Sequence, residues 1–189
     1  MATASLHHYT PEEYLAMERG APFKSEYRDG RILAMTGTTA RHAQIVLNLG
    51  AELHTRFGDG PCSAFVNDLR VRIERENRYV YPDLVALCEQ PRFEDGVLDT
   101  LMNPSLVVEV LSESTEAYDR GEKFAAYRRL ESIAEYVLVA QDRIAVERYR
   151  REGDVWTFTA FESMDHILEL ASIDASVPLA RIYRRTGIG

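Results

Sequence analysis

Glu109 is the residue whose surroundings most strongly suggest chemistry. It interrupts the apolar run Leu106-Val-Val-Glu-Val-Leu111, which is typical of a central strand covered on both faces. A carboxylate in such a strand is costly unless it is paired, protonated or bound to a cation. An arginine partner, or a strand end in water, is the ordinary alternative, and we favour a functional role.

Asp83 is a second acid in an unusual position. It follows Pro82 inside a strand-like segment, and proline removes a hydrogen bond from the strand ladder. Pro82 therefore indicates an edge, an end or an irregularity, from which Asp83 could point into a cleft. A plain turn aspartate is the alternative, but pairing with Glu109 on a candidate neighbouring strand favours function.

Two carboxylates from adjacent strands suit a hard divalent cation. Mg²⁺ (or Mn²⁺) prefers oxygen ligands and keeps several waters, and the backbone carbonyl of Val110 could add a ligand. Such a metal would acidify a bound water and neutralise charge developing on a phosphodiester. The sequence thus predicts a metal site formed by Asp83, Glu109 and Val110.

Capping and periodicity predict the elements that must position these acids. Thr10-Pro-Glu-Glu13 is a capping box that predicts a helix from Thr10 to about Arg19. Asp29-Gly30 predicts a tight hairpin between strands at 25–29 and 31–36. The other predicted elements are helices at about 40–56 and 119–130, strands at 64–74, 79–87, 105–111, 136–140, 143–150 and 155–161, a polar loop at 89–103, and short strands over 167–183.

An ordered set of short motifs resembles a known family. The matching segments are 9–15, 26–30, 42, 81–83, 104–112, 119–123 with 127, and 135–136. Each is weak, but the set is similar to the bacterial Uma-two family of restriction-endonuclease-like proteins, within the Pro-Asp…Asp/Glu-x-Lys nuclease superfamily. The resemblance implies an α/β fold with an αβββαβ core and a mixed sheet flanked by helices. To this core we add an N-terminal helix-hairpin and extra C-terminal strands, in one domain over 1–189 with its core at about 38–141.

The resemblance also implies metal-dependent hydrolysis of nucleic acid, with DNA favoured, and self-association as a homodimer. One position departs from the pattern, because Leu111 stands where the superfamily has a lysine, on the same strand face as Glu109. Lys123, on the following helix, is the candidate replacement, orienting or deprotonating the attacking water or stabilising the phosphate. A solvated helix lysine is the alternative.

Three further polar residues are candidates for the site. Glu26, in the hairpin motif, could complete the metal shell or be a surface charge beside Arg28. His42 and Ser112 could contact substrate or a phosphate, although a structural role is favoured for His42. Arginine-rich turns could track phosphates, but solvated charges are favoured; they lie at 128–129, 148, 150–151 and 184–185.

Composition limits the remaining function classes. A net charge of −8 counts against a large, uniform phosphate-binding surface. No signal peptide and no bilayer-spanning run is evident, so we expect a cytoplasmic protein without membrane association. Cys62 and Cys88 are interpreted as two small buried thiols in a reducing compartment. A non-catalytic protein of the same fold, acting as a binding or assembly module, is the alternative to a nuclease. Leu111 and the acidic balance favour the module, whereas the retained acids favour the nuclease, which is our first hypothesis.

Overall fold

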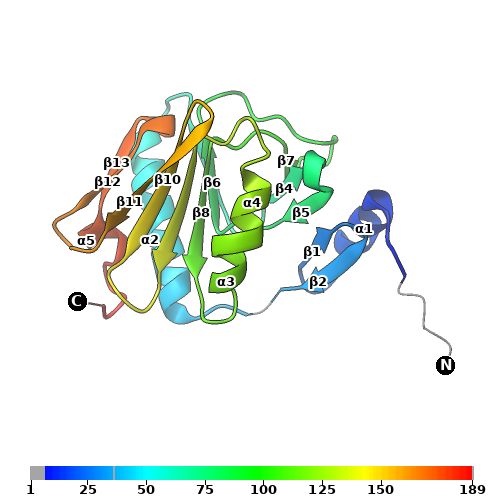
Figure 1. The fold of residues 1–189 in the computed structure, drawn as a ribbon, viewed down its shortest axis with the longest axis horizontal. Coiled ribbons are helices and arrows are strands. Elements are labelled where there is room, and N and C mark those ends of the chain that lie inside the picture. The colour runs from blue at the N-terminus through cyan, green and yellow to red at the C-terminus, as the bar shows by residue number, and fades with distance from the viewer. Residues whose placement is uncertain (1–6, 36, 189) are drawn as a thin grey trace.

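The computed structural model describes residues 7–35 and 37–188 and has helices on both faces of a mixed β-sheet (Figure 1). The helices are α1 (Pro11–Glu18), α2 (Ala40–Phe57), α3 (Glu116–Tyr118), α4 (Phe124–Tyr127) and α5 (Leu179–Ile182). The strands are β1 (Ser25–Arg28), β2 (Arg31–Ala34), β3 (Ser63–Val66), β4 (Arg70–Ile73), β5 (Arg78–Val80), β6 (Leu84–Leu87), β7 (Thr100–Leu101), β8 (Leu106–Leu111), β9 (Glu135–Ala140), β10 (Val146–Glu152), β11 (Val155–Phe161), β12 (Ile167–Leu170) and β13 (Ala175–Pro178).

The central sheet has the strand order β11-β10-β9-β8-β6-β3. Strand β8 lies at its centre, antiparallel to β6 and parallel to β9, and all of its residues are buried. One face packs on α2, α5 and the β12–β13 hairpin, and the other packs on α4 and on β4 and β5. The predicted central strand around Glu109 and the predicted fold class are therefore confirmed.

The N-terminal helix and hairpin form as the local signals predict. Thr10 caps α1 through a complete capping box, and Asp29 and Gly30 turn between β1 and β2 with positive φ angles of 43° and 84°. Thr36, which the prediction placed in the second strand, lies outside the described residues. Strand β1 joins a second sheet, ordered β2-β1-β5-β4-β7, through its pairing with β5.

Two predicted strands are wrong as single elements, because each divides between the two sheets. The run 64–74 becomes β3 and β4, and the run 79–87 becomes β5 and β6. The first breaks at Asn67, which has a φ of 60°, and the second breaks at Pro82, which has no N–H for a ladder. The Asn67 N–H donates to the Asp83 carbonyl at 3.0 Å, so the two breaks lie side by side. An alternating pattern reports burial, not which sheet a strand joins.

The helix predicted at 119–130 forms as one continuous helical segment over 116–127, with a π-helical turn inside it. It consists of α3, a π-helical turn over Asp119–Lys123, and α4. The π-helical turn buries both of its end residues, and such turns are frequent at functional sites. The predicted loop 89–103 contains the short strand β7, and the predicted C-terminal strands end in α5.

The two cysteines are not free thiols, which corrects the sequence-based expectation. Cys62 and Cys88 form a disulfide, and both are only half-buried. Strands β3 and β6 are antiparallel with Ser63 opposite Leu87, so the cysteines that flank this pair face one another. In the described part of the chain, no helix combines the length and the apolar character that a membrane crossing needs.

Candidate active site

Asp83 and Glu109 converge at one end of the β6–β8 pair. Leu84 lies opposite Val108, so the same register places Asp83 opposite Glu109. The Val110 N–H donates to Asp83 Oδ2 at 2.7 Å, which ties Asp83 to the strand that carries Glu109. The two predicted acids thus share one region of the molecule.

Lys123 points toward these acids from the π-helical turn. Its Nζ lies 2.9 Å from Glu109 Oε1, 3.4 Å from Glu26 Oε1 and 3.7 Å from Asp119 Oδ1. Its side chain is buried, so it is not a solvated helix lysine. The π-helical turn brings both Asp119 and Lys123 to the acids.

Glu26 reaches the same cluster from β1 and is not a surface charge. Its Oε1 accepts the Tyr81 N–H at 3.1 Å, and its Oε2 accepts the Tyr118 hydroxyl at 3.1 Å. Tyr127, on α4, donates its hydroxyl to Glu109 Oε1 at 3.3 Å. Sequence reasoning assigned no site role to these tyrosines or to Asp119. The motifs that resemble the family nevertheless include Tyr81, Asp119 and Tyr127.

His42 and Ser112 lie at the edges of the site. The His42 N–H donates to the capping Thr39 hydroxyl, and His42 Nε2 lies 3.1 Å from Asp83 Oδ2. The Ser112 hydroxyl lies 2.9 Å from the Thr115 hydroxyl. His42 therefore contacts a predicted metal ligand directly, whereas Ser112 bonds within its own loop. Substrate contacts by either residue stay predictions.

The charges of the cluster do not balance. Burial raises the pKa of Glu109 well above its ordinary value; Lys123 opposes this, and Asp119 and Asp83 add to it. Burial alone would lower the pKa of Lys123, but Glu109, Glu26 and Asp119 raise it well above the ordinary value. The Lys123 ammonium contacts three carboxylates, and Asp83, beside His42, adds a fourth negative charge to the cluster. This excess of negative charge favours an additional cation or proton.

The cluster opens into a cleft of about 1830 Å³. Its lining includes the six predicted site side chains, Glu26, His42, Asp83, Glu109, Ser112 and Lys123, together with the backbone neighbour Val110. The β1–β2 hairpin and the start of α2 also line it, so segments distant in sequence form its walls.

Asp83 and Glu109 each leave one carboxylate oxygen available to a ligand. Among the described residues, no group of three or more His, Cys, Asp or Glu side chains has the arrangement of a metal cage. Asp83 Oδ1 and Glu109 Oε2 accept no hydrogen bond from the described part of the chain. Magnesium is commonly held by one or two protein carboxylates, with waters as its remaining ligands. Asp83 and Glu109 could supply those two carboxylates.

Comparisons with known proteins show the family of the chain. Residues 11–180 match the model of the Uma2 family, which is described as "Putative restriction endonuclease". Two relatives from Synechocystis sp. PCC 6803 are the uncharacterized proteins sll1609 and slr1290. They are 37% identical over 160 residues (84% of this chain, 90% of the relative) and 36% identical over 176 residues (93% and 91%).

A solved structure shares the fold. It is described as a putative nuclease belonging to DUF820 from Anabaena variabilis, and it aligns with a TM-score of 0.75 over 93% of this chain and 97% of that chain. Its identity of 17% makes this a likeness of fold alone. Because the family match spans most of the sequence, this chain belongs to the Uma2 family.

Proposed function

We propose that this protein is a metal-dependent nuclease that hydrolyses phosphodiester bonds of nucleic acid. One observation carries the proposal: acids from two neighbouring strands, Asp83 and Glu109, meet at a cleft where the Lys123 ammonium lies 2.9 Å from Glu109. Two carboxylates that can hold a metal ion and a lysine that can stabilise negative charge suit the hydrolysis of a phosphodiester. The family description and the fold of the neighbouring structure support the same reading.

Asp83 and Glu109 would hold Mg²⁺ or Mn²⁺, with the Val110 carbonyl or Glu26 as auxiliary ligands. The bound ion would supply an acidified water and neutralise charge on the phosphate. Asp83 is already oriented by the Val110 N–H and by His42, so the side chain needs little reorganisation. His42 and Ser112 remain candidates for contact with a substrate phosphate, since both line the cleft.

Lys123 would act as a charged donor. The surrounding carboxylates hold its pKa well above the ordinary value, so it stays protonated at neutral pH. A protonated lysine can orient the attacking water or stabilise negative charge on the phosphate, whereas it cannot remove a proton. Glu26 would keep the ammonium in place through its 3.4 Å contact.

Cleavage of labelled oligonucleotides tests the proposal. Single- and double-stranded DNA and RNA would be incubated with the protein in Mg²⁺, in Mn²⁺ and in EDTA. Asp83→Asn and Glu109→Gln should each lower the cleavage rate by about 100-fold or more, because several kcal/mol of charge stabilisation are lost. Asp165→Asn, an exposed aspartate outside the cleft lining, is the matched control and should cleave like the wild type.

Calorimetric titration with Mn²⁺ provides a second test that needs no substrate. Saturable binding in the wild type that weakens in Asp83→Asn supports the proposal. No saturable binding, or equal binding in both proteins, contradicts it and favours a non-catalytic binding or assembly module with this fold.

A further inference from the structure

Tyr81 touches two charged residues of the site through its backbone alone. Its N–H donates to Glu26 Oε1 at 3.1 Å, and its carbonyl accepts from Lys123 Nζ at 3.5 Å. Asp83 follows two residues later. The backbone position of Tyr81 therefore bears on Glu26, Lys123 and Asp83 together.

The strand ladders do not hold this part of the backbone. Residues 81–83 lie between β5 and β6, outside both strands. Pro82 has no N–H, and the Tyr81 N–H is used by the Glu26 side chain. Apart from the bond from the Asn67 N–H to the Asp83 carbonyl, the segment is therefore held by side-chain contacts.

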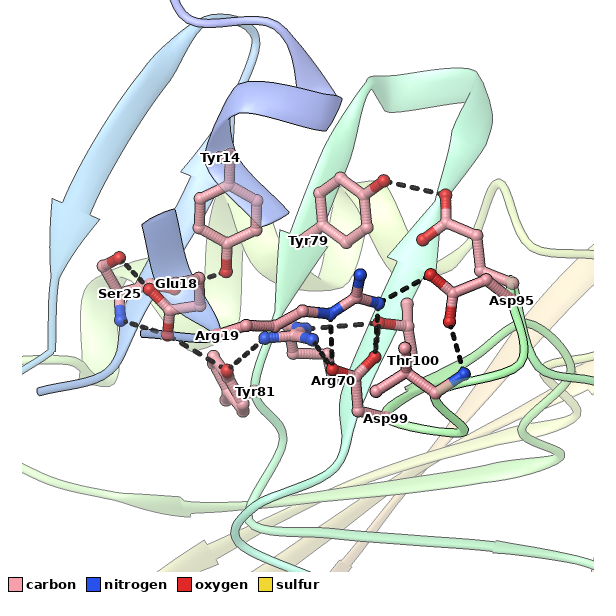
Figure 2. A network of polar contacts seen from close by, with 12 residues as sticks. Tyr14, Glu18, Arg19, Ser25, Arg70, Tyr79, Tyr81, Asp95, Asp99 and Thr100 are labelled. Atoms are coloured by element: carbon pink, nitrogen blue, oxygen red, sulfur yellow. Dashed lines mark hydrogen bonds and ion pairs between the residues drawn. The ribbon is translucent and has the colours of Figure 1, made fainter. Parts of the chain in front are cut away.

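Those contacts are made by the Tyr81 side chain, whose hydroxyl enters a buried polar network (Figure 2). The hydroxyl accepts from Arg70 Nη1 at 3.0 Å and donates to Glu18 Oε1 at 3.0 Å. Arg70 is itself buried and held from its other side, with Nε donating to the Thr100 hydroxyl at 3.2 Å and an ion pair to Asp99.

Glu18 links the same network to the strand that carries Glu26. Its Oε1 accepts the Ser25 N–H at 2.9 Å as well as the Tyr81 hydroxyl. Ser25 directly precedes Glu26, and its carbonyl accepts the Tyr14 hydroxyl at 2.6 Å. The buried Glu18 carboxylate thus joins Ser25 and Tyr81 (Figure 2). Ser25 precedes Glu26, and Tyr81 lies two residues before Asp83.

We infer that Arg70 and Glu18 are positioning residues of the site, acting through Tyr81 on Glu26 and Lys123. Neither residue lines the cleft, so neither touches a substrate. A buried Arg70 that has Tyr81 and Asp99 as acceptors has little freedom to move, because each lost partner would leave a buried donor unsatisfied. The effect on cleavage rests on the proposed nuclease function, whereas the effect on the placement of Lys123 does not.

Tyr81→Phe is the sharpest test, because it removes only the hydroxyl that joins the network to the backbone. Tyr79→Phe is the matched control. Tyr79 is also buried and also donates its hydroxyl to a carboxylate, Glu94 Oε1 at 2.7 Å. In the described part of the chain, no hydrogen bond joins Tyr79 to Glu26 or Lys123. A general loss of packing or stability would affect both variants alike.

The sequence offers a clean spectroscopic reporter, since Lys24 and Lys123 are its only lysines. Protein labelled with ¹³C-lysine gives two Cε signals, which are measured against an added reference compound because Lys24 Nζ lies 5.5 Å from the centroid of the Tyr81 ring. At neutral pH without metal, Tyr81→Phe should shift the Lys123 signal, and Tyr79→Phe should leave it in place. Mn²⁺ affinity, measured by calorimetry, should fall about 10-fold in Tyr81→Phe alone, as for other residues that orient metal ligands.

A Lys123 signal that superimposes on the wild type in Tyr81→Phe, or that moves equally in Tyr79→Phe, would overturn the inference. Glu18 provides a second variant pair. Glu18→Gln retains an acceptor for Ser25 and Tyr81 and should preserve the wild-type signal, whereas Glu18→Ala should shift it. If the wild type neither cleaves nor binds Mn²⁺, the proposed function fails, but the Lys123 spectra still decide the positioning role.

Discussion

Lys123 Nζ lies 2.9 Å from Glu109 Oε1, and the two side chains expose only 6% and 3% of their surface. The ammonium beside Glu109 thus comes from the next helical segment, and not from the position two residues after the acid. Leu111, which occupies the usual position, packs into the apolar core instead. The charge is therefore retained in the cluster although the motif is broken.

Lys123→Met should lower the free energy of unfolding by about 3–5 kcal/mol, because it leaves Glu109 buried without its cationic partner. Adding Glu109→Gln should recover part of that loss. Urea unfolding of the wild type, both single variants and the double variant gives the coupling between the two side chains. Lys24→Met is the control, since the Lys24–Asp68 pair is exposed and should contribute about 0–1 kcal/mol. A cost for Lys123→Met as small as that of the control would contradict the buried pair.

The Cys62–Cys88 disulfide closes a loop with a sequence separation of 26 residues. Loop-closure entropy predicts that reducing it lowers the free energy of unfolding by about 3–4 kcal/mol. Unfolding with and without dithiothreitol measures the effect, and Cys62→Ser/Cys88→Ser should match the reduced wild type and no longer respond to reductant. Two free thiols in the denatured, unreduced protein would show that the bond does not form.

Ionisation of Tyr183 should lower the free energy of unfolding at alkaline pH. Its hydroxyl is buried and donates to the Ala145 carbonyl, and burial raises the pKa of Tyr183 to about 12. Because the folded state holds the proton more tightly than the unfolded chain, whose pKa is about 10, this contribution is complete below pH 10 and is lost toward pH 12. The loss should reach about 2 kcal/mol. Tyr183→Phe lacks this titration, so its stability relative to the wild type should rise across the same window; parallel curves would refute the assignment.

Asp99 should make the free energy of unfolding fall at acidic pH, whereas Tyr183 makes it fall at alkaline pH. Hydrogen bonds from Arg19 lower the pKa of Asp99, burial opposes them, and Arg70 lowers it further. A depressed folded-state pKa means that the contribution is present above the unfolded value of about 4 and is lost as the pH falls below it. Asp99→Asn should therefore show a flatter decline of the unfolding free energy below pH 4, followed by circular dichroism. Asp165→Asn, which changes an exposed aspartate, should decline as steeply as the wild type.

Local signals in the sequence determined several elements correctly. The Thr10 capping box begins α1, Asp29-Gly30 turns the first hairpin, and the apolar run around Glu109 forms the central strand. Each depends on residues within a few positions of one another, so the backbone conformation follows from neighbouring side chains. The sequence also indicated Asp83 and Glu109 as candidates. Asp83 follows a proline inside a strand-like segment and Glu109 interrupts an apolar run, and both signals are local.

Only the tertiary structure decided which charges meet. Whether Lys123 and Glu26 are buried together depends on the pairing of β1 with β5 and on the π-helical turn, and neither leaves a local signal. The same holds for the breaks at Asn67 and Pro82, which assign each strand to its sheet, and for the register that joins Cys62 to Cys88. These features depend on contacts between segments far apart in the chain, and the free energy of such contacts exists only once the sheets have assembled.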